Sequence, residues 1–119
     1  MSPLAVALGD PAGIGPEVVA KAWALRERHA LPAFFAVGDA RSIAAIWDGP
    51  VERIAAPQEA EAVFGRALPL LQVEDAGEIV PGQPNMPGAR CSLDALEMAA
   101  GLARSGAAGA LVTGPVAKA

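Results

Sequence analysis

The stretch GDPAGIGPE, at residues 9–17, follows the first apolar run of the chain and could hold a small charged ligand. Three glycines and two prolines occupy five of its nine positions, and Asp10 places a carboxylate near its start. Gly13 and Gly15 have no side chain, so the backbone there can approach a ligand closely. This loop is therefore expected to line a binding site.

A second stretch of this kind, TGPVAK, lies at residues 113–118 after another short apolar run. It offers a hydroxyl at Thr113 and, at Lys118, a cation suited to a phosphate or a carboxylate. In open α/β sheets ligands bind beyond the carboxyl ends of the strands, so the two loops line one crevice if their strands are neighbours. The sequence assigns no catalytic residue, and the expected crevice residues are Asp10, Gly13, Gly15, Thr113, Gly114 and Lys118.

Neither common phosphate-binding motif is present in the first loop. A dinucleotide fingerprint needs a third glycine after Gly13 and Gly15, and Val18 stands at that position. A Walker loop needs Gly-Lys-Ser or Gly-Lys-Thr at the start of the helix, where this chain has Gly15, Pro16 and Glu17. Because Glu17 would also oppose a phosphate at that helix end, the loop is not expected to be a general phosphate cradle.

Short apolar runs alternate with amphipathic stretches along the chain. We expect strands at residues 4–8, 33–37, 51–55, 68–73 and 110–112, because each is a short run rich in apolar residues. We expect helices at residues 16–29, 40–47, 58–66 and 93–104, where apolar residues recur at helical spacing. This alternation is typical of a doubly wound α/β fold, with a mostly parallel sheet and flanking helices.

Residues 74–90 are rich in proline and glycine and show no periodicity, so we expect a loop whose role the sequence leaves open. Ser92 is then expected to cap the N-terminus of the last helix, and Gly106 to end it. A parallel strand normally has a helix after it, and none follows residues 110–112. We therefore expect residues 1–119 to be the N-terminal part of a larger α/β protein, with an incomplete sheet that favours self-association.

Charge and cysteine content narrow the expected partners and location. Thirteen acidic and nine basic side chains are scattered along the chain and give a net charge of −4, so neither nucleic acid nor a membrane is an expected partner. The single cysteine, Cys91, cannot form an internal disulfide, which fits a reducing compartment. The first residues lack the basic start of a secretory leader, and the expected location is the cytoplasm.

Several isolated residues that could carry chemistry are expected to have structural roles instead. His29 is the only histidine, so a zinc site made of several imidazoles cannot form from this chain alone. Cys91 has no histidine nearby in sequence and is expected to be a buried, inert thiol. Trp23 and Trp47 are expected to pack in the core, and Asp39 is expected to cap the following helix rather than bind a ribose.

The two loops together resemble those of the 4-hydroxythreonine-4-phosphate dehydrogenase family of vitamin B6 biosynthesis. Members of that family have a GDPAGIGPE-type loop after their first strand and TGPxxK after a later buried strand. Both motifs stand here in that order, at residues 9–17 and 113–118. The family is similar in fold to isocitrate and isopropylmalate dehydrogenases, whose corresponding loop lacks the Pro11 and Ala12 present here, so the B6 family is favoured.

This resemblance implies an enzyme that oxidises the secondary hydroxyl of 4-phosphooxy-L-threonine, a small phosphorylated hydroxy-amino acid, with NAD or NADP. The 3-oxo acid formed would lose carbon dioxide to give 3-amino-2-oxopropyl phosphate. The resemblance also implies a homodimer and a divalent metal (Zn, Mg or Co) held by histidines of both subunits. In the family those histidines follow TGPxxK, so no metal ligand is expected in this chain, and the 119 residues alone are expected to be inactive.

Three other functions stay open at the level of the sequence. One is a dehydrogenase that acts on a related substrate such as 4-phospho-threonate. Another is a phosphate acyltransferase, which is built on a related α/β architecture and needs no nicotinamide. The third is a non-catalytic regulator or interaction module. The choice of substrate, of NAD or NADP and of metal depends on residues outside the sequence.

Overall fold

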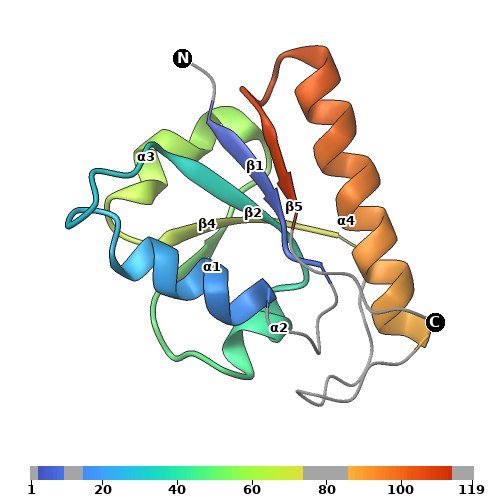
Figure 1. Cartoon of the computed structure of the whole chain (residues 1–119), viewed down its shortest axis with the longest axis horizontal. Coiled ribbons are helices and arrows are strands. Elements are labelled where there is room, and N and C mark those ends of the chain that lie inside the picture. Colours follow the sequence, from blue (N-terminus) through green and yellow to red (C-terminus); the bar gives the residue numbers. More distant parts are fainter. Residues whose placement is uncertain (1–2, 10–14, 74–85, 114–119) are drawn as a thin grey trace.

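The chain forms a parallel β-sheet with helices on both faces (Figure 1). The computed structural model describes residues 3–9, 15–73 and 86–113, apart from the side chains at positions 86–89 and 113. In chain order the described elements are β1 (Leu4–Ala7), α1 (Gly15–Ala24), β2 (Phe34–Gly38), α2 (Ala40–Ala44), β3 (Val51–Arg53), the 3-10 helix η1 (Pro57–Glu59), α3 (Ala60–Phe64), β4 (Leu68–Gln72), α4 (Met86–Ser105) and β5 (Leu111–Thr113). The expected doubly wound α/β class is confirmed.

The strand order of the sheet is β3-β4-β2-β1-β5, and every neighbouring pair is parallel. The connection from β4 to β5 therefore passes β2 and β1, and α4 spans that distance along one face (Figure 1). Right-handed crossovers put α1 and α2 on one face of such a sheet and α3 and α4 on the other. Within the described ranges, no helix combines the length and apolar character needed to cross a membrane.

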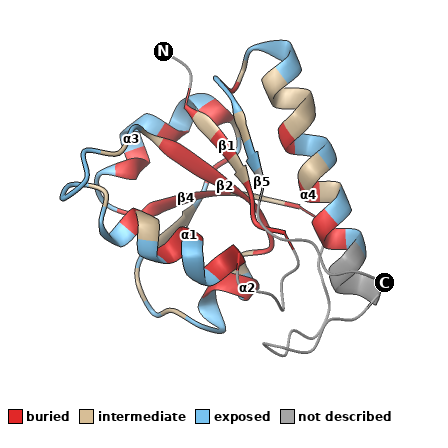
Figure 2. Cartoon of the chain, in the orientation of Figure 1, coloured by how far each residue is buried: buried red, intermediate tan, exposed pale blue. Residues whose placement is uncertain are grey.

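Two apolar clusters, one on each face, form the core. Phe35 and Val37 of β2 belong to the cluster that includes α3 and α4, whereas Phe34 and Ala36 belong to the cluster that includes α1 and α2. All five residues of β2 are buried, as expected for a strand covered on both sides (Figure 2). On α4, Ala95 and Ala99 are fully buried in the first cluster. Such small side chains let a helix lie close to the sheet, which fits the alanine-rich composition.

Helix α1 ends at Ala24, five residues before the expected end, and turns follow up to residue 30. Just after this end, the guanidinium of Arg26 donates to the carbonyls of Trp23, at 3.0 Å, and Gly65, at 2.9 Å. The same guanidinium lies 3.7 Å from the centroid of the Trp23 ring. The indole of Trp23 donates to the carbonyl of Phe64 at 2.9 Å. These contacts join the end of α1 to the end of α3.

Helix α4 begins at Met86, within the region expected to be a loop. The loop prediction is therefore wrong for residues 86–90, while residues 74–85 lie outside the described part. Pro87 is the second residue of α4, and the first turn of a helix tolerates proline because the N–H groups there have no intrahelical partner. The predicted N-cap role of Ser92 is also wrong, because this residue lies inside α4. Gly106 has φ +83° directly after the helix and confirms its predicted end.

Candidate functional site

Strands β1 and β5 are parallel neighbours, with Ala7 paired to Thr113. The two motif loops therefore begin at the same edge of the sheet, as the crevice hypothesis requires. Of the predicted crevice residues, only Gly15 and the backbone of Thr113 belong to the described part of the structure. Asp10, Gly13, Gly114 and Lys118 lie outside it, so their grouping around a ligand stays a prediction.

The first loop begins at Gly9, a residue that the sequence analysis did not single out. Gly9 is buried and has φ +78°, a conformation that residues with a Cβ rarely adopt. Leu8, just before it, donates its N–H to the carbonyl of Val37 at 3.0 Å. This bond extends the pairing of β1 with β2 to the residue just before Gly9. The position of Gly9 directly after an apolar run was the sequence signal for this start of the loop.

The first loop ends at α1, whose first two residues, Gly15 and Pro16, are buried. Glu17 in the first turn is exposed and forms an ion pair with Lys21 at 3.1 Å, four residues further along the helix. A carboxylate near the N-terminus of a helix stabilises the helix and repels other anions. This arrangement agrees with the expectation that the loop is not a general phosphate cradle.

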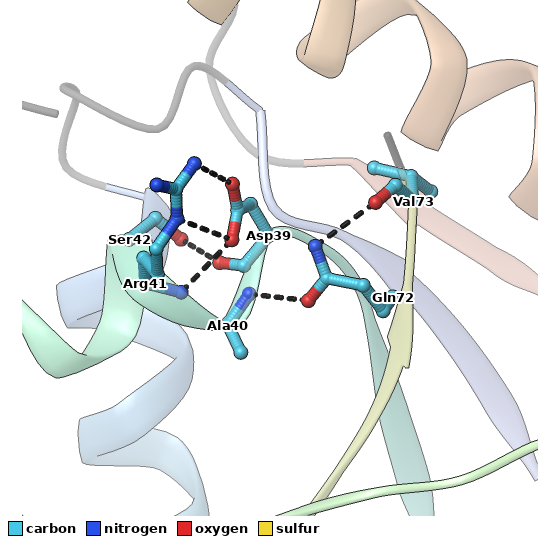
Figure 3. A network of polar contacts seen from close by, with 6 residues as sticks. All are labelled: Asp39, Ala40, Arg41, Ser42, Gln72 and Val73. Atoms are coloured by element: carbon cyan, nitrogen blue, oxygen red, sulfur yellow. Dashed lines mark hydrogen bonds and ion pairs between the residues drawn. The ribbon is translucent and has the colours of Figure 1, made fainter. Parts of the chain in front are cut away.

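At the end of β2, Asp39 is the N-cap of α2, as predicted (Figure 3). Its side chain is almost completely buried, accepts the backbone N–H of Arg41 at 3.0 Å and pairs with the Arg41 guanidinium at 3.0 Å. Ser42 adds a hydrogen bond from its hydroxyl to the carbonyl of Asp39 at 2.6 Å. Both carboxylate oxygens of Asp39 thus accept hydrogen bonds from within the chain, which supports a structural role rather than ribose binding.

Gln72, the last residue of β4, completes this network from the neighbouring strand (Figure 3). Its side-chain oxygen accepts the N–H of Ala40 at 2.9 Å, and its amide nitrogen donates to the carbonyl of Val73 at 2.9 Å. The N–H of Ser42 donates to the carbonyl of Asp39 at 3.0 Å. The first three N–H groups of α2 are therefore satisfied, so this helix end does not offer an anion site. The sequence analysis missed Gln72, although a polar residue ending an apolar strand was a signal.

The N-terminal end of α4 lies at the same edge of the sheet, because α4 leads from the carboxyl end of β4 back to the start of β5 (Figure 1). Ser92 is 1% exposed, and its hydroxyl has no hydrogen-bond partner among the residues that the structure describes. Cys91 beside it is buried, as predicted.

The remaining isolated residues have structural positions. His29, in the turns after α1, is exposed. Trp23 and Trp47 pack edge to face with their ring centroids 5.8 Å apart, which confirms their packing role.

Sequence comparisons connect this geometry to a known group of enzymes. Over 119 residues, which is the whole chain, it is 50% identical to 4-hydroxythreonine-4-phosphate dehydrogenase from Zymomonas mobilis. It is 44% identical to the protein of the same name from Caulobacter vibrioides, over 98% of the chain. A scan against protein-family models finds no match.

Solved structures agree with the fold. A crystal structure of 4-hydroxythreonine-4-phosphate dehydrogenase from Klebsiella pneumoniae superposes on 99% of this chain with a TM-score of 0.81 and 25% identity. One from Burkholderia phymatum gives a TM-score of 0.76 at 24% identity, again over 99% of the chain. These matches cover 38% and 37% of the two solved chains.

The fold and the relatives together define an α/β protein of the dehydrogenase class. The family to which the chain belongs is that of the 4-hydroxythreonine-4-phosphate dehydrogenases. The chain spans 36% of the length of the Zymomonas relative and 35% of the Caulobacter one.

Proposed function

We propose that the protein containing this chain is an NAD- or NADP-dependent 4-hydroxythreonine-4-phosphate dehydrogenase, and that residues 1–119 form one wall of its substrate crevice. The observation that carries the proposal is the 50% identity over all 119 residues with the Zymomonas enzyme of that name. The parallel pairing of β1 with β5 supports it, because both motif loops begin at the ends of these strands. The proposed location is the cytoplasm, which fits a chain with one cysteine.

The proposed substrate is 4-phosphooxy-L-threonine. Oxidation of its secondary alcohol removes the hydroxyl proton and, as a hydride, the hydrogen on the same carbon; a bound nicotinamide supplies the hydride acceptor. The product is a 3-oxo acid in which the carboxylate is β to the new ketone. Its carbon–carbon bond to the carboxylate breaks, carbon dioxide leaves, and the electron pair moves toward the ketone oxygen. Protonation of the resulting enol carbon then gives 3-amino-2-oxopropyl phosphate.

Within this wall, the loop residues are proposed to bind and orient the substrate. Lys118 is a cation suited to the phosphate or carboxylate, and Thr113 offers a hydroxyl that can donate or accept a hydrogen bond. Gly13, Gly15 and Gly114 leave the backbone accessible to a ligand, and Asp10 adds a carboxylate. Binding at several points fixes the distance and angle between the reacting carbon and the hydride acceptor, which is a large part of the catalytic task.

A divalent metal does not fit the described part of this chain. Among residues 3–9, 15–73 and 86–113, no group of three His, Cys, Asp or Glu side chains lies close enough together to hold a metal ion. On the family resemblance, its ligands are proposed to come from the rest of the longer protein, including the second subunit of a homodimer.

The test uses the polypeptide extended to the length of its relatives, obtained by sequencing the gene beyond codon 119. With a divalent metal and NAD or NADP, 4-phosphooxy-L-threonine should produce reduced nicotinamide, and a chelator should abolish the signal. Faster turnover of 4-phospho-threonate would change the proposed substrate but keep the reaction. Coenzyme A binding without nicotinamide reduction would favour a phosphate acyltransferase and contradict the proposal.

A matched pair of lysine variants tests the crevice residues. Lys118→Gln should raise the KM for the phosphorylated substrate by about tenfold or more, because a charge-assisted contact is lost. Lys21→Gln is the control, since Lys21 is exposed and pairs only weakly with Glu17 on the surface of α1. Equal KM values for the two variants would remove Lys118 from the site.

A further inference from the structure

Three residues form a row across the carboxyl edge of the sheet, on three neighbouring strands. Gly38 of β2 pairs with Gln72 of β4 in the parallel register. On the other side of Gly38 lies Leu8, one residue beyond Ala7, the last β1 residue that pairs with β2. Side chains at one level of a parallel sheet point to the same face. Leu8 and Gln72 therefore both lie on the face of α1 and α2, on either side of a residue without a side chain.

Both ends of the Gln72 side chain are held by backbone groups (Figure 3). Its oxygen accepts the N–H of Ala40 at 2.9 Å, and its nitrogen donates to the carbonyl of Val73 at 2.9 Å. The N–H of Val73 in turn donates to the carbonyl of Gly38 at 3.0 Å. These three hydrogen bonds fix the chain from Gly38 to Ala40 against the end of β4.

Capping of α2 does not by itself account for the contacts of Gln72. Helix α2 has five residues, and Asp39 already caps it by accepting the N–H of Arg41 at 3.0 Å. The bond from Gln72 to the carbonyl of Val73 adds nothing to the helix. It joins the Gln72 side chain to the residue whose N–H holds Gly38.

The position of Gly38 also determines the position of the end of β1. A Cβ added to Gly38 would collide with the Leu8 side chain, so Leu8 lies directly against the backbone of Gly38. The N–H of Leu8 donates to the carbonyl of Val37 at 3.0 Å. Because protein interiors are close-packed, a shift of Gly38 displaces Leu8. The first motif loop begins at the next residue, Gly9.

We infer that Gln72 is a positioning residue for the substrate crevice. Its side chain fixes Gly38, Gly38 fixes Leu8, and Leu8 sets the point at which the first motif loop begins. In this role Gln72 acts through Leu8 rather than by contact with the substrate. The inference rests on the proposed function, in which the first motif loop binds the phosphorylated substrate.

The experiment compares Gln72→Met with Gln58→Met in the extended polypeptide. Methionine keeps the length of the side chain but has no N–H donor and only a weak acceptor. Gln58 is exposed in η1 and is the matched control. Each variant is studied by steady-state kinetics with 4-phosphooxy-L-threonine and by hydrogen exchange of the Leu8 and Leu68 amides. Leu68 is the internal reference, since its N–H donates to the carbonyl of Pro50 at 2.9 Å, at the opposite edge of the sheet.

We expect Gln72→Met to raise the KM for the phosphorylated substrate about fivefold, the factor that the net contribution of one hydrogen bond gives, with kcat changed by less than about twofold. The Leu8 amide should exchange at least about fivefold faster, and the Leu68 amide at an unchanged rate. Gln58→Met should change neither the kinetics nor the exchange.

Unchanged exchange at Leu8 in Gln72→Met would overturn the inference, whatever the kinetics. Equal acceleration at Leu8 and Leu68 would also overturn it, because the cause would then be a general loss of stability. Faster exchange at Leu8 with an unchanged KM would show that Gln72 holds the end of β1 but does not position the crevice. Failure of the proposed function is seen separately, as a lack of nicotinamide reduction by the unsubstituted polypeptide.

Discussion

A Cβ atom on Gly38 would lie 2.7 Å from Cδ1 of Leu8, closer than two carbon atoms can pack. Leu8 is 1% exposed, and its N–H donates to the carbonyl of Val37 at 3.0 Å. The space left by the missing side chain of Gly38 is therefore filled by Leu8 at the carboxyl end of the sheet. Because Gly9 follows directly, this contact also fixes the point at which the first motif loop begins.

Replacing Gly38 with alanine tests this contact. The added methyl group would displace Leu8 within a closely packed core, so we expect Gly38→Ala to lower the free energy of unfolding by about 1–3 kcal/mol. Urea unfolding measures this change. In the extended polypeptide, displacement of Leu8 should also lower kcat/KM, since the first motif loop begins one residue later.

Gly65→Ala is the control for this prediction. Gly65 is exposed at the end of α3 and has φ −71°, and apart from its chain neighbours no heavy atom of the described residues would lie within 4 Å of an added Cβ. Alanine there should be neutral or should stabilise the protein by up to about 1 kcal/mol through the unfolded state. If both variants lost the same stability, steric contact with Leu8 would not be the cause.

Two substitutions of Asp39 separate a structural role from ligand binding. Asp39→Ala removes both the cap on Arg41 and the ion pair with its guanidinium, and we expect a loss of about 2–3 kcal/mol in unfolding free energy. Asp39→Asn keeps an oxygen that can accept the Arg41 N–H and should lose less. A ribose ligand would behave differently, since both variants would then raise the KM for the nicotinamide at unchanged stability.

The strands were predictable from the sequence because buried parallel strands are short apolar runs, as at Phe34–Gly38. Helix ends were less predictable because distant residues decide them. Just after α1, the guanidinium of Arg26 binds the carbonyl of Gly65, 39 residues away in sequence. At α4, Pro87 and Gly88 are typical of loops, yet both lie in the first turn of the helix, where proline is tolerated.

The candidate site was predictable only in part. The motif loops were visible as glycine-rich stretches, but no local pattern states which strands are neighbours, and the crevice hypothesis required β1 beside β5. Gln72 was missed because its role depends on a hydrogen bond to the N–H of Ala40. Ala40 follows β2, whereas Gln72 ends β4, so no local pattern joins the two residues. Asp39 was predictable because its cap involves residues directly after it.

The turns after α1 contain a residue whose backbone is unfavourable for its type. Ala30 has φ +49°, a left-handed conformation that costs about 1 kcal/mol or more for a residue with a Cβ. Ala30→Gly should therefore raise the free energy of unfolding by up to about 1 kcal/mol, after the larger unfolded-state entropy of glycine is included. Thermal unfolding followed by circular dichroism would detect the change.

The matched control is Ala62→Gly, at an exposed position inside α3. Glycine there should lower stability by about 0.5–1 kcal/mol, because it loses more backbone freedom than alanine in a helix. Opposite signs at positions 30 and 62 are the expected result. A loss at both positions would contradict the strain at Ala30.

Replacing Ser92 with alanine distinguishes an N-cap position from a position inside α4, because the two positions predict opposite changes in the free energy of unfolding. If Ser92 were an N-cap, as expected from the sequence, its replacement by alanine would lower the free energy of unfolding by about 1 kcal/mol. Inside α4, its buried hydroxyl has no hydrogen-bond partner within the described part of the chain, so Ser92→Ala removes an unsatisfied polar group and introduces a better helix former. We therefore expect Ser92→Ala to raise the free energy of unfolding, measured with urea, by about 1 kcal/mol.

Ser42→Ala is the matched control for Ser92→Ala, because both serines are 1% exposed and the Ser42 hydroxyl donates a hydrogen bond to the carbonyl of Asp39 at 2.6 Å. Its replacement should lower stability by about 1 kcal/mol, the usual contribution of such a bond. If Ser92→Ala were instead destabilising in the extended polypeptide, the hydroxyl would have a partner from beyond residue 119. Lower activity at unchanged stability would place that partner in the crevice, because the N-terminal end of α4 lies at the edge where both motif loops begin.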